Sequence, residues 1–338
     1  MKKIGLDVRC GRHISVGMRT YIHEVSARLP QVAPHYQFLR YDRGENLGYA
    51  DQVVLPLRIA LDRVDLTHYM AHYVPALASG RFVFTIHDLI HLRFLKFFRA
   101  YIGPYYMSVV RRACRMAARV ITSDARTVED LTHFFKLDPA KIVVVPLAPR
   151  ERFFDPAPPY RGERPYLLNV GNHREHKDIP TLLEAWSSLP PSYEIDLYLT
   201  GPDNFGGELQ RRSSSTRRAV ALGDVDDDAL ASYYAGARAL VHPSLLEGFG
   251  LPFVEAMAQG CPVIATTSSI PRPVAEAALT FEPRDVEGAR AQIVRLLDDQ
   301  ALRGSLVERG RIAVSALSWQ RTARETAAVY DDVLREAR

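Results

Sequence analysis

The stretch that decides the fold runs from 237 to 266 and reads ARALVHPSLLEGFGLPFVEAMAQGCPVIAT. A short apolar run stops at His242 and predicts a strand. A polar loop with two glycines follows at 244–250, and Pro252 suits the first turn of a helix, where its missing N–H is not needed. That helix ends near Gly260, and a second apolar run predicts the next strand. Strand, loop, helix and strand in this order are typical of a parallel α/β sheet.

The loop and the helix start carry groups that bind anions and hydroxyls. The amides of Phe249, Gly250 and Leu251 lie where a helix begins, so their N–H groups lack intrahelical acceptors. Glu247 stands on the loop and Glu255 about one turn into the helix, and an ionised carboxylate accepts hydrogen bonds from a pair of hydroxyls. We expect one carboxylate to hold a sugar ring and the other a ribose, with a diphosphate between them. An alternative stays open, in which Glu255 complements the helix dipole and Glu247 is solvated.

The run HPSLLEGFGLPFVEAMAQGCPVIAT, 242–266, resembles the signature of the retaining GT-B glycosyltransferases of family 4, and the resemblance extends along nearly the whole chain. These enzymes move a sugar from a nucleotide donor to an acceptor. The resemblance implies an α/β fold of two Rossmann-like, doubly wound parallel-sheet domains that face each other across a cleft. The N-terminal acceptor-binding domain is expected at 1–157, the nucleotide-sugar-binding domain at 158–318, and a C-terminal helix at 319–338 is expected to cross back to the first domain. Strand–helix alternation in both halves favours the same architecture.

Length and composition agree with two domains of ordinary size, because the chain has 338 residues. No apolar run approaches the roughly 20 residues of a membrane span. The start, MKKIGLDVRC, lacks a long apolar segment, so we expect a cytoplasmic protein. Cys10, Cys114 and Cys261 are scattered and predict free thiols rather than a disulfide framework or a zinc site. The Pro-rich stretch FFDPAPPYRGERP places the domain boundary near 157.

A cationic loop follows the strand predicted at 166–170. Lys177 comes six residues after Gly171, with His173, Arg174 and His176 beside it. Fixed cations at the carboxyl end of a strand neutralise a diphosphate and stabilise the charge that builds on a nucleoside diphosphate leaving group. The alternative for Lys177 is a solvated loop charge.

The family resemblance implies the roles of the donor-binding residues. Lys177 matches the lysine of the family pattern, Asp178 replaces the usual asparagine, and Asn172 stands where an arginine is common, so Arg174 is the substitute. The catalytic residues implied are His87, Lys177 and Glu247. The donor-binding set is Gly17, Asn172, Arg174, Lys177, Gly223, Glu247, Gly248, Phe249, Gly250, Leu251 and Glu255.

In the first half, the apolar run RFVFTI at 81–86 predicts a strand that ends in His87-Asp88. Ligands bind at the carboxyl ends of parallel strands. The segment HDLIH lacks the glutamate of a zinc helix and follows a strand, so it does not predict a metal site. The resemblance implies that His87 faces the donor sugar and that Asp88 contacts the acceptor; a structural histidine is the alternative.

Gly17 comes just before a helical pattern in which Tyr21, Val25 and Leu29 share one face. A strand, a glycine-containing loop and a helix start form a phosphate-binding or substrate-binding arrangement in α/β folds. Family members usually carry more glycines here, and Arg19 stands at one such position. Arg19 is therefore expected either to close over an acceptor or phosphate or to point to solvent.

The segment 93–119 is basic and aromatic, with seven Lys and Arg residues and no acidic residue between Asp88 and Asp124. Two interpretations are open: a peripheral contact with an anionic membrane surface, and an ordinary helix with a solvated basic side. Nucleic acid is not favoured as a partner, because no binding motif accompanies the charge and the net charge is only +4.

Residues 206–218, GGELQRRSSSTRR, are predicted to be a mobile polar surface segment.

Taken together with these residues, the family resemblance implies a retaining hexosyltransferase that uses a nucleotide-diphosphate sugar as co-substrate, and we expect no cofactor and no metal. The H-K-D loop at 176–178 resembles that of mannosyltransferase-like members and favours GDP-mannose or a related donor. The expected acceptor is a glycan or a lipid-linked glycan in polysaccharide assembly. The alternatives are a catalytically silent GT-B binding module and a GT-B epimerase of the UDP-sugar type.

Overall fold

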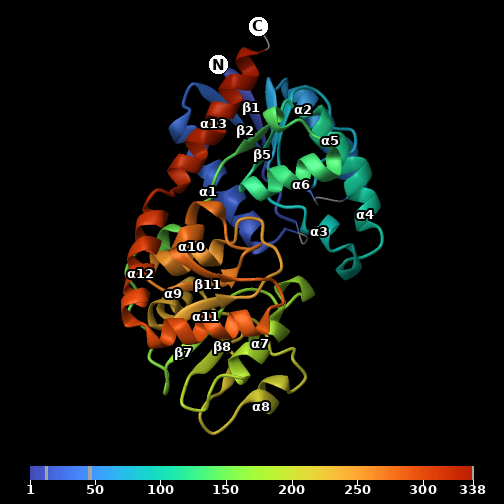
Figure 1. Ribbon diagram of the computed structural model, residues 1–338. Coiled ribbons are helices and arrows are strands. Elements are labelled where there is room, and N and C mark those ends of the chain that lie inside the picture. The colour runs from blue at the N-terminus through green and yellow to red at the C-terminus, as the bar shows by residue number, and fades with distance from the viewer. Residues whose placement is uncertain (12–13, 45–47, 337–338) are drawn as a thin grey trace. The chain divides into compact units, whose positions relative to one another are not determined.

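The computed structural model describes residues 1–11, 14–44 and 48–336 (Figure 1). The chain divides into two compact units, Met1–Leu147 with Ser318–Arg338, and Ala148–Leu317. The division lies before the Pro-rich stretch that placed the boundary near 157. Its position follows from packing, because the Gln259 side chain donates to the backbone oxygens of Phe153 (2.7 Å) and Asp155 (2.8 Å) and so holds this segment in the second unit.

The first unit contains a six-stranded parallel sheet with the order β2-β1-β3-β4-β5-β6. Its strands are β1 (Lys2–Asp7), β2 (Tyr36–Tyr41), β3 (Leu66–Tyr69), β4 (Phe82–Thr85), β5 (Arg119–Thr122) and β6 (Ile142–Val144). Its helices and short turns are α1 (Val16–Val32), α2 (Tyr49–Asp62), α3 (Ile90–Arg93), η1 (Leu95–Phe97), α4 (Ile102–Tyr105), η2 (Tyr106–Val110), α5 (Arg111–Met116), α6 (Ala125–Phe135), η3 (Pro139–Lys141) and α13 (Trp319–Arg335).

The second unit contains another six-stranded parallel sheet, with the order β12-β11-β10-β7-β8-β9. Its strands are β7 (Tyr166–Asn169), β8 (Asp196–Leu199), β9 (Ala219–Ala221), β10 (Ala239–His242), β11 (Val263–Thr266) and β12 (Ala278–Phe281). Its helices and short turns are η4 (Glu151–Phe154), η5 (Glu175–Lys177), α7 (Ile179–Ser187), α8 (Glu208–Arg212), α9 (Asp227–Gly236), α10 (Leu251–Ala258), η6 (Arg272–Ala277), α11 (Val286–Asp298) and α12 (Gln300–Ser315). The predicted pair of doubly wound parallel-sheet domains is confirmed.

The helices form where apolar spacing and caps predict them. On α1 the buried side chains Tyr21, Ile22, Val25 and Leu29 lie on one face, as their spacing indicates. Asp124 caps α6 by accepting a hydrogen bond from the Arg126 amide at 2.9 Å. Among the described residues, no helix is both long and apolar enough to cross a bilayer.

The C-terminal helix α13 belongs to the first unit, although it follows the second in the sequence. Its apolar face buries Trp319, Ala323 and Tyr330, and it packs on α1. The Tyr330 hydroxyl lies 2.6 Å from Nδ1 of His68 on β3, and Thr322 donates to the backbone oxygen of Pro146 at 2.7 Å. These contacts anchor the end of the chain on the first sheet.

Two segments differ from their predictions. In 206–218, a short helix α8 buries Leu209, and Arg217 is 5% exposed because it donates to three backbone oxygens of residues 186–190. The segment is therefore not simply a polar surface loop, since its arginine fills the carbonyl sites at the end of α7. The basic segment 93–119 forms several short helical pieces rather than one amphipathic helix, with Gly103 and Pro104 in its middle.

Candidate functional site

The candidate site of the second unit lies on loops that follow two neighbouring strands, β7 and β10. All strands of this sheet are parallel, so their carboxyl ends meet at one edge. The Asn169 side chain donates to the backbone oxygen of Val241 at 2.8 Å and joins the ends of the two strands. Beyond the strands, the Leu245 amide donates to the backbone oxygen of His176 at 2.8 Å. These bonds fix the turn that carries Lys177 against the loop that carries Glu247.

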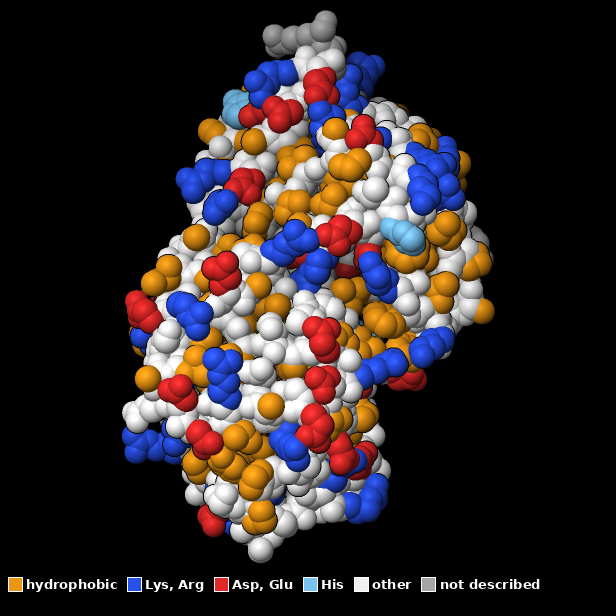
Figure 2. Space-filling model, in the orientation of Figure 1, with side chains coloured by type: hydrophobic (Ala, Val, Ile, Leu, Met, Phe, Trp, Pro, Cys, Tyr) orange, Lys and Arg blue, Asp and Glu red, His pale blue; other side chains and the backbone are white. Residues whose placement is uncertain are grey.

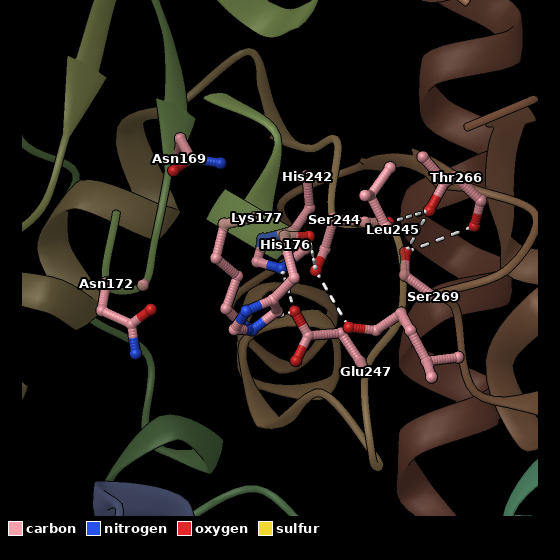
Figure 3. A network of polar contacts seen from close by, with 12 residues as sticks. Asn169, Asn172, His176, Lys177, His242, Ser244, Leu245, Glu247, Thr266 and Ser269 are labelled. Carbon is pink, nitrogen blue, oxygen red and sulfur yellow. Dashed lines mark hydrogen bonds and ion pairs between the residues drawn. The ribbon is translucent and has the colours of Figure 1, made fainter. Parts of the chain in front are cut away.

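Three side chains meet at this point and form the Lys177–Glu247–His242 cluster (Figure 3). Lys177 Nζ lies 2.5 Å from Glu247 Oε1, and His242 Nε2 lies 2.8 Å from the same oxygen. All three side chains are largely buried, with exposures of 13%, 10% and 3% for Lys177, Glu247 and His242. The cluster therefore places a cation, an anion and an imidazole together at the edge of the sheet where ligands bind.

The cluster keeps Glu247 ionised. Burial of its carboxyl raises the pKa, but the charge of Lys177 and the hydrogen bond from His242 outweigh that effect and hold the pKa well below its usual range. Burial lowers the pKa of His242, although Glu247 opposes the shift. A neutral His242 that donates through Nε2 leaves Nδ1 as an acceptor, and this buried nitrogen has no partner among the described residues. The Glu247 carboxylate is thus oriented and charged before any ligand arrives.

The loop between Glu247 and α10 needs glycine at one position. Gly250 precedes α10 with φ +77°, and a Cβ there would lie 2.4 Å from the ring of Phe253. Pro252 stands in the first turn of the helix. The amides of Phe249, Gly250 and Leu251 therefore lie at a helix start, where backbone N–H groups are available to an anion or a hydroxyl.

A third loop supports the site from the end of β11. The Thr266 hydroxyl donates to the backbone oxygen of Ser244 and lies 2.8 Å from the Ser269 hydroxyl. The Ser268 hydroxyl donates to the backbone oxygen of Leu245 at 2.8 Å. Figure 3 shows Thr266 and Ser269 beside Leu245 of the loop that carries Glu247. The loop is thus fixed by its neighbours on both sides, β7 and β11.

Glu255 lies in a separate network. Its carboxylate, 2% exposed in α10, accepts a hydrogen bond from Arg150 Nε at 3.0 Å, and Arg150 also pairs with Asp227 of α9. Burial raises the pKa of Glu255, and Arg150 opposes that shift. The structure does not bring Glu255 into contact with Lys177 or Glu247, so the two carboxylates have different partners.

The remaining donor-binding candidates of the second unit lie along the same sheet edge. Asn172 and Arg174 are exposed in the loop after β7, and no ion pair of Arg174 occurs within the described part of the chain. Gly223, with φ +68°, follows β9 and pairs through backbone hydrogen bonds of 2.8 and 3.1 Å with Gly201 after β8. Gly248 and Phe249 are buried in the loop that carries Glu247.

In the first unit, His87 follows β4 and its ring packs edge-on against Tyr21, with 4.5 Å between ring centroids. Both ring nitrogens are buried and have no partner among the described residues. Burial lowers the pKa of His87 to about 4, so the imidazole is neutral at pH 7. A buried imidazole with an unused donor and an unused acceptor is suited to a ligand hydroxyl.

Tyr21 is itself held by a buried hydrogen-bond chain. Its hydroxyl lies 3.0 Å from that of Thr85, which lies 2.7 Å from Nε2 of His68, and His68 continues to Tyr330 of α13. The ring that packs on His87 is therefore linked to the C-terminal helix through side chains from four elements.

The other candidates of the first unit lie at the surface or in the first turns of helices. Gly17 lies inside the first turn of α1 rather than before it, because Ser15 caps the helix by accepting from the Met18 amide at 3.3 Å. Arg19 is exposed on the same helix. Asp88 accepts a hydrogen bond from the Ile90 amide at 3.1 Å. Neighbouring residues 12–13 lie outside the described chain.

Two residues of these networks, His242 and Arg150, were not predicted from the sequence. His242 was visible as the last residue of an apolar run, but its bond to Glu247 depends on a fold of the loop that spacing does not reveal. Arg150 is 105 positions from Glu255 in the sequence, and no local pattern links the two residues.

Among the described residues, no group of three or more His, Cys, Asp or Glu side chains is arranged to hold a metal ion.

Each of the two units matches a glycosyltransferase family model. Residues 17–148 match the model described as Glycosyltransferase Family 4, and residues 164–299 match the model described as Glycosyl transferases group 1. Similar proteins include the O-antigen chain mannosyltransferase B of Escherichia coli, 34% identical over 49% of this chain and 45% of that protein. Another is the MMP alpha-(1->4)-mannosyltransferase of Mycolicibacterium hassiacum, 29% identical over 68% of this chain and 57% of that protein. The chain thus spans about half the length of these curated relatives.

Solved structures share the fold. The sucrose-phosphate synthase of Thermosynechococcus elongatus superposes with a TM-score of 0.80 at 20% identity, over 99% of this chain and 100% of that chain. HepE of Anabaena in complex with UDP and glucose superposes with a TM-score of 0.74 at 16% identity, over 98% of this chain and 100% of that chain.

Proposed function

Because the chain belongs to the group 1 glycosyltransferases of family 4, we propose that it transfers a hexose from a nucleotide-diphosphate sugar to a glycan acceptor. The single observation that carries this proposal is the Lys177–Glu247–His242 cluster. A buried cation beside a helix start suits a diphosphate, and a buried carboxylate suits sugar hydroxyls. Both groups lie at the carboxyl edge of a parallel sheet, where such ligands bind.

We assign the roles of the residues as follows. Lys177 neutralises the diphosphate, with Arg174 as a weaker helper and Asn172 beside it. Glu247 accepts hydrogen bonds from the donor sugar, and the amides from Gly248 to Leu251 add donors at the start of α10. Glu255 holds the ribose, which has to compete with Arg150 for the carboxylate. Gly223 lies by the base.

The first unit supplies the acceptor side of the proposal. His87 offers a neutral imidazole to a substrate hydroxyl, and its unpartnered nitrogens support this role. Asp88 and Arg19 are assigned to the acceptor, and Gly17 to the donor phosphates. These assignments rest on the family resemblance and on the positions of the residues around the ends of β1 and β4.

The proposed reaction retains the configuration at the anomeric carbon. The bond from that carbon to the donor phosphate oxygen breaks, and a bond to the acceptor oxygen forms on the same face. The departing phosphate oxygen takes the proton of the acceptor hydroxyl. Lys177 stabilises the charge that develops on the diphosphate during this step, so the proposal assigns no role to a cofactor or a metal.

Mannose is the proposed sugar, with GDP-mannose as the first donor to test. The H-K-D loop and the similarity to two mannosyltransferases support this choice. A glycan in polysaccharide assembly, free or lipid-linked, is the proposed acceptor. We also propose that the protein works at the cytoplasmic face of a membrane, where the basic segment 93–119 meets anionic lipid.

A transfer assay with matched carboxamide variants tests the proposal. Glu247→Gln removes the charge but keeps the size of the side chain, and we expect the rate of transfer to fall by about 100-fold or more. Glu175→Gln, in the exposed part of the same turn as Lys177, is the control and should match the wild type. Equal transfer by Glu247→Gln and wild type would refute the site. Absence of donor turnover in all three proteins would favour a silent module, and interconversion of UDP-sugars without transfer would favour an epimerase.

A further inference from the structure

The second unit contains an open pocket that the proposed transfer does not use. It has a volume of about 570 Å³, and all of its lining residues belong to this unit. Sites for small molecules are typically of this size, with apolar walls and a few polar groups. The wall of this pocket is mostly apolar and includes Phe154, Pro156, Pro159, Ala235, Ala258 and Val314.

The pocket lies at the edge of the sheet opposite the Lys177–Glu247–His242 cluster. Ala235 and Ala258 stand near the ends of α9 and α10, shortly before β10 and β11 begin. The cluster, in contrast, lies at the carboxyl ends of β7 and β10. A ligand of the pocket would therefore be separate from a donor bound at the cluster.

Hydrogen bonds fix one wall of the pocket. The side chain of Gln259 binds the backbone of 153–157 through three hydrogen bonds, of 2.7, 2.8 and 3.2 Å. Further along the chain, the Tyr160 amide donates to the backbone oxygen of Ser232 on α9 at 2.9 Å. The segment that carries Phe154 is thus held at both ends, so this wall is formed before any ligand binds.

Arg311 is the only charged residue among the described residues that line the pocket. Its guanidinium lies beside Gly260, just after α10, since a Cβ there would be 2.8 Å from its Nη2. Within the described part of the chain, its side chain makes no ion pair and no hydrogen bond. The polar side chains of Gln259 and Ser315 are already bonded to backbone oxygens. Arg311 therefore remains as the side-chain donor for an anionic ligand.

The apolar wall suits an aromatic ring. The side chain of Phe154 is 41% exposed, and the rings of Pro156 and Pro159 line the same wall. Figure 2 shows acidic and basic side chains intermixed over the region where Figure 1 draws α11 and α12, which is not the pattern of a surface that binds polyanions. A small ligand with one anionic group fits these features better than a polyanion does.

We propose that this pocket is a second ligand site, for a small aromatic anion whose ring packs on Phe154 and the two prolines. Its carboxylate, sulfonate or phosphate group binds Arg311. Two segments of the wall, 154–159 and 314–315, adjoin the points where the chain passes from one unit to the other, so the ligand contacts both connections. The site goes beyond the proposed transfer and shares no residue with the donor-binding set.

Fluorescence titration with two matched probes tests the proposal. Anilinonaphthalene sulfonate is an anion, and phenylnaphthylamine has the same rings without the sulfonate. The wild type should bind one equivalent of the sulfonate. Arg311→Met should raise the Kd of the sulfonate about ten-fold and leave that of the neutral probe unchanged, because only a charge-assisted hydrogen bond is lost. Arg309→Met is the control, since Arg309 lies on the same helix but donates to the Glu276 oxygen, and it should bind both probes as the wild type does.

A second pair of variants tests the apolar wall. Phe154→Ala should raise the Kd of both probes about five-fold, because both lose the contact with its ring. Ile312→Ala removes a 62% exposed apolar side chain of α12 outside the pocket and should change neither Kd. Thermal melting followed by circular dichroism shows whether each variant is folded.

Competition with GDP separates the pocket from the donor site. Saturating GDP should leave the sulfonate bound, because the cluster lies at the other edge of the sheet. The probe titrations contain neither donor nor acceptor, so they decide the proposal even if the protein transfers no sugar. Displacement of the sulfonate by GDP would overturn the proposal. So would a wild type that binds neither probe, or an Arg311→Met variant that binds the sulfonate as tightly as the wild type.

Discussion

The two units differ in the buried groups that lie at the carboxyl edges of their sheets. In the second unit, the buried carboxylate Glu247 is paired with Lys177 and His242 and stays ionised. In the first unit, the buried imidazole His87 is neutral and has no hydrogen-bond partner among the described residues. The comparison shows that the sheet edge of one unit carries an internally paired cation and anion, whereas that of the other carries a neutral imidazole whose hydrogen-bonding groups are unused among the described residues.

The largest expected effect is on the acid stability of the first unit. Burial lowers the pKa of His68 and His72 to about 3 and that of His87 to about 4, against an ordinary value of 6.5. Between pH 6.5 and pH 4 the unfolded chain therefore binds protons that the folded unit does not, so stability falls as the pH falls. Each histidine should cost about 1.4 kcal/mol per pH unit in that window. Together they are expected to unfold the first unit near pH 4, since domains have about 5–15 kcal/mol to lose.

The two tryptophans allow this to be measured unit by unit. Trp186 lies in the second unit and Trp319 in the first, and the chain contains no other tryptophan. In the variant Trp186→Phe, the fluorescence of Trp319 should report unfolding of the first unit. The denaturant concentration at the midpoint of this unfolding should decrease as the pH is lowered from 6.5 to 4. His87→Gln should make that slope shallower. A midpoint that stays constant over this range would show that the buried histidines titrate normally.

The next effect compares the two carboxylates of the second unit. We expect Glu255→Gln to raise the KM for the donor about ten-fold with little change in kcat, because a ribose contact is made equally in the ground state and the transition state. Glu247→Gln, in contrast, should lower kcat. Steady-state kinetics with GDP-mannose separates the two. If Glu255→Gln lowers only the melting temperature and leaves KM unchanged, Glu255 is a structural partner of Arg150 and the ribose role is wrong.

The smallest effect concerns the hydrogen-bond chain behind His87. Tyr330→Phe removes the hydroxyl that His68 contacts at 2.6 Å and should cost about 1 kcal/mol of stability, since a buried polar group loses its partner. Tyr193→Phe, whose hydroxyl bonds Asp298 at an exposed site, is the control and should cost less. Denaturant unfolding of both variants gives the comparison. An equal loss of unfolding free energy in the two variants would indicate that the buried hydrogen-bond chain stabilises the protein no more than an exposed hydroxyl hydrogen bond does.

Much of the fold was predictable because its signals are local. Apolar runs bounded by glycine and proline gave the strands on either side of α10, and the approach of Phe253 explains why Gly250 is needed. Lys177 and Glu247 were identified by residue type and position. Their contact follows from the order of strands in the sheet, in which β7 lies beside β10. That order cannot be predicted from the spacing of residues along the chain.

The parts that escaped prediction depend on distant partners or on a misleading composition. Arg217 stands in a polar run that is typical of solvated charges. In the structure its guanidinium donates to backbone carbonyl groups at the end of α7, and the side chain is buried. The outward apolar side of α2 has the spacing of an ordinary core face, and only the structure shows which side of the helix packs inward.

The most direct test of the central claim is calorimetric titration of the protein with GDP and, in parallel, with UDP. If Lys177 holds the diphosphate, Lys177→Met should raise the Kd of the preferred nucleotide by about 100-fold, about 2.7 kcal/mol, whereas Arg218→Met on the surface of the same unit should leave it unchanged. A Kd in Lys177→Met equal to that of the wild type would contradict the account, because the diphosphate would then bind elsewhere.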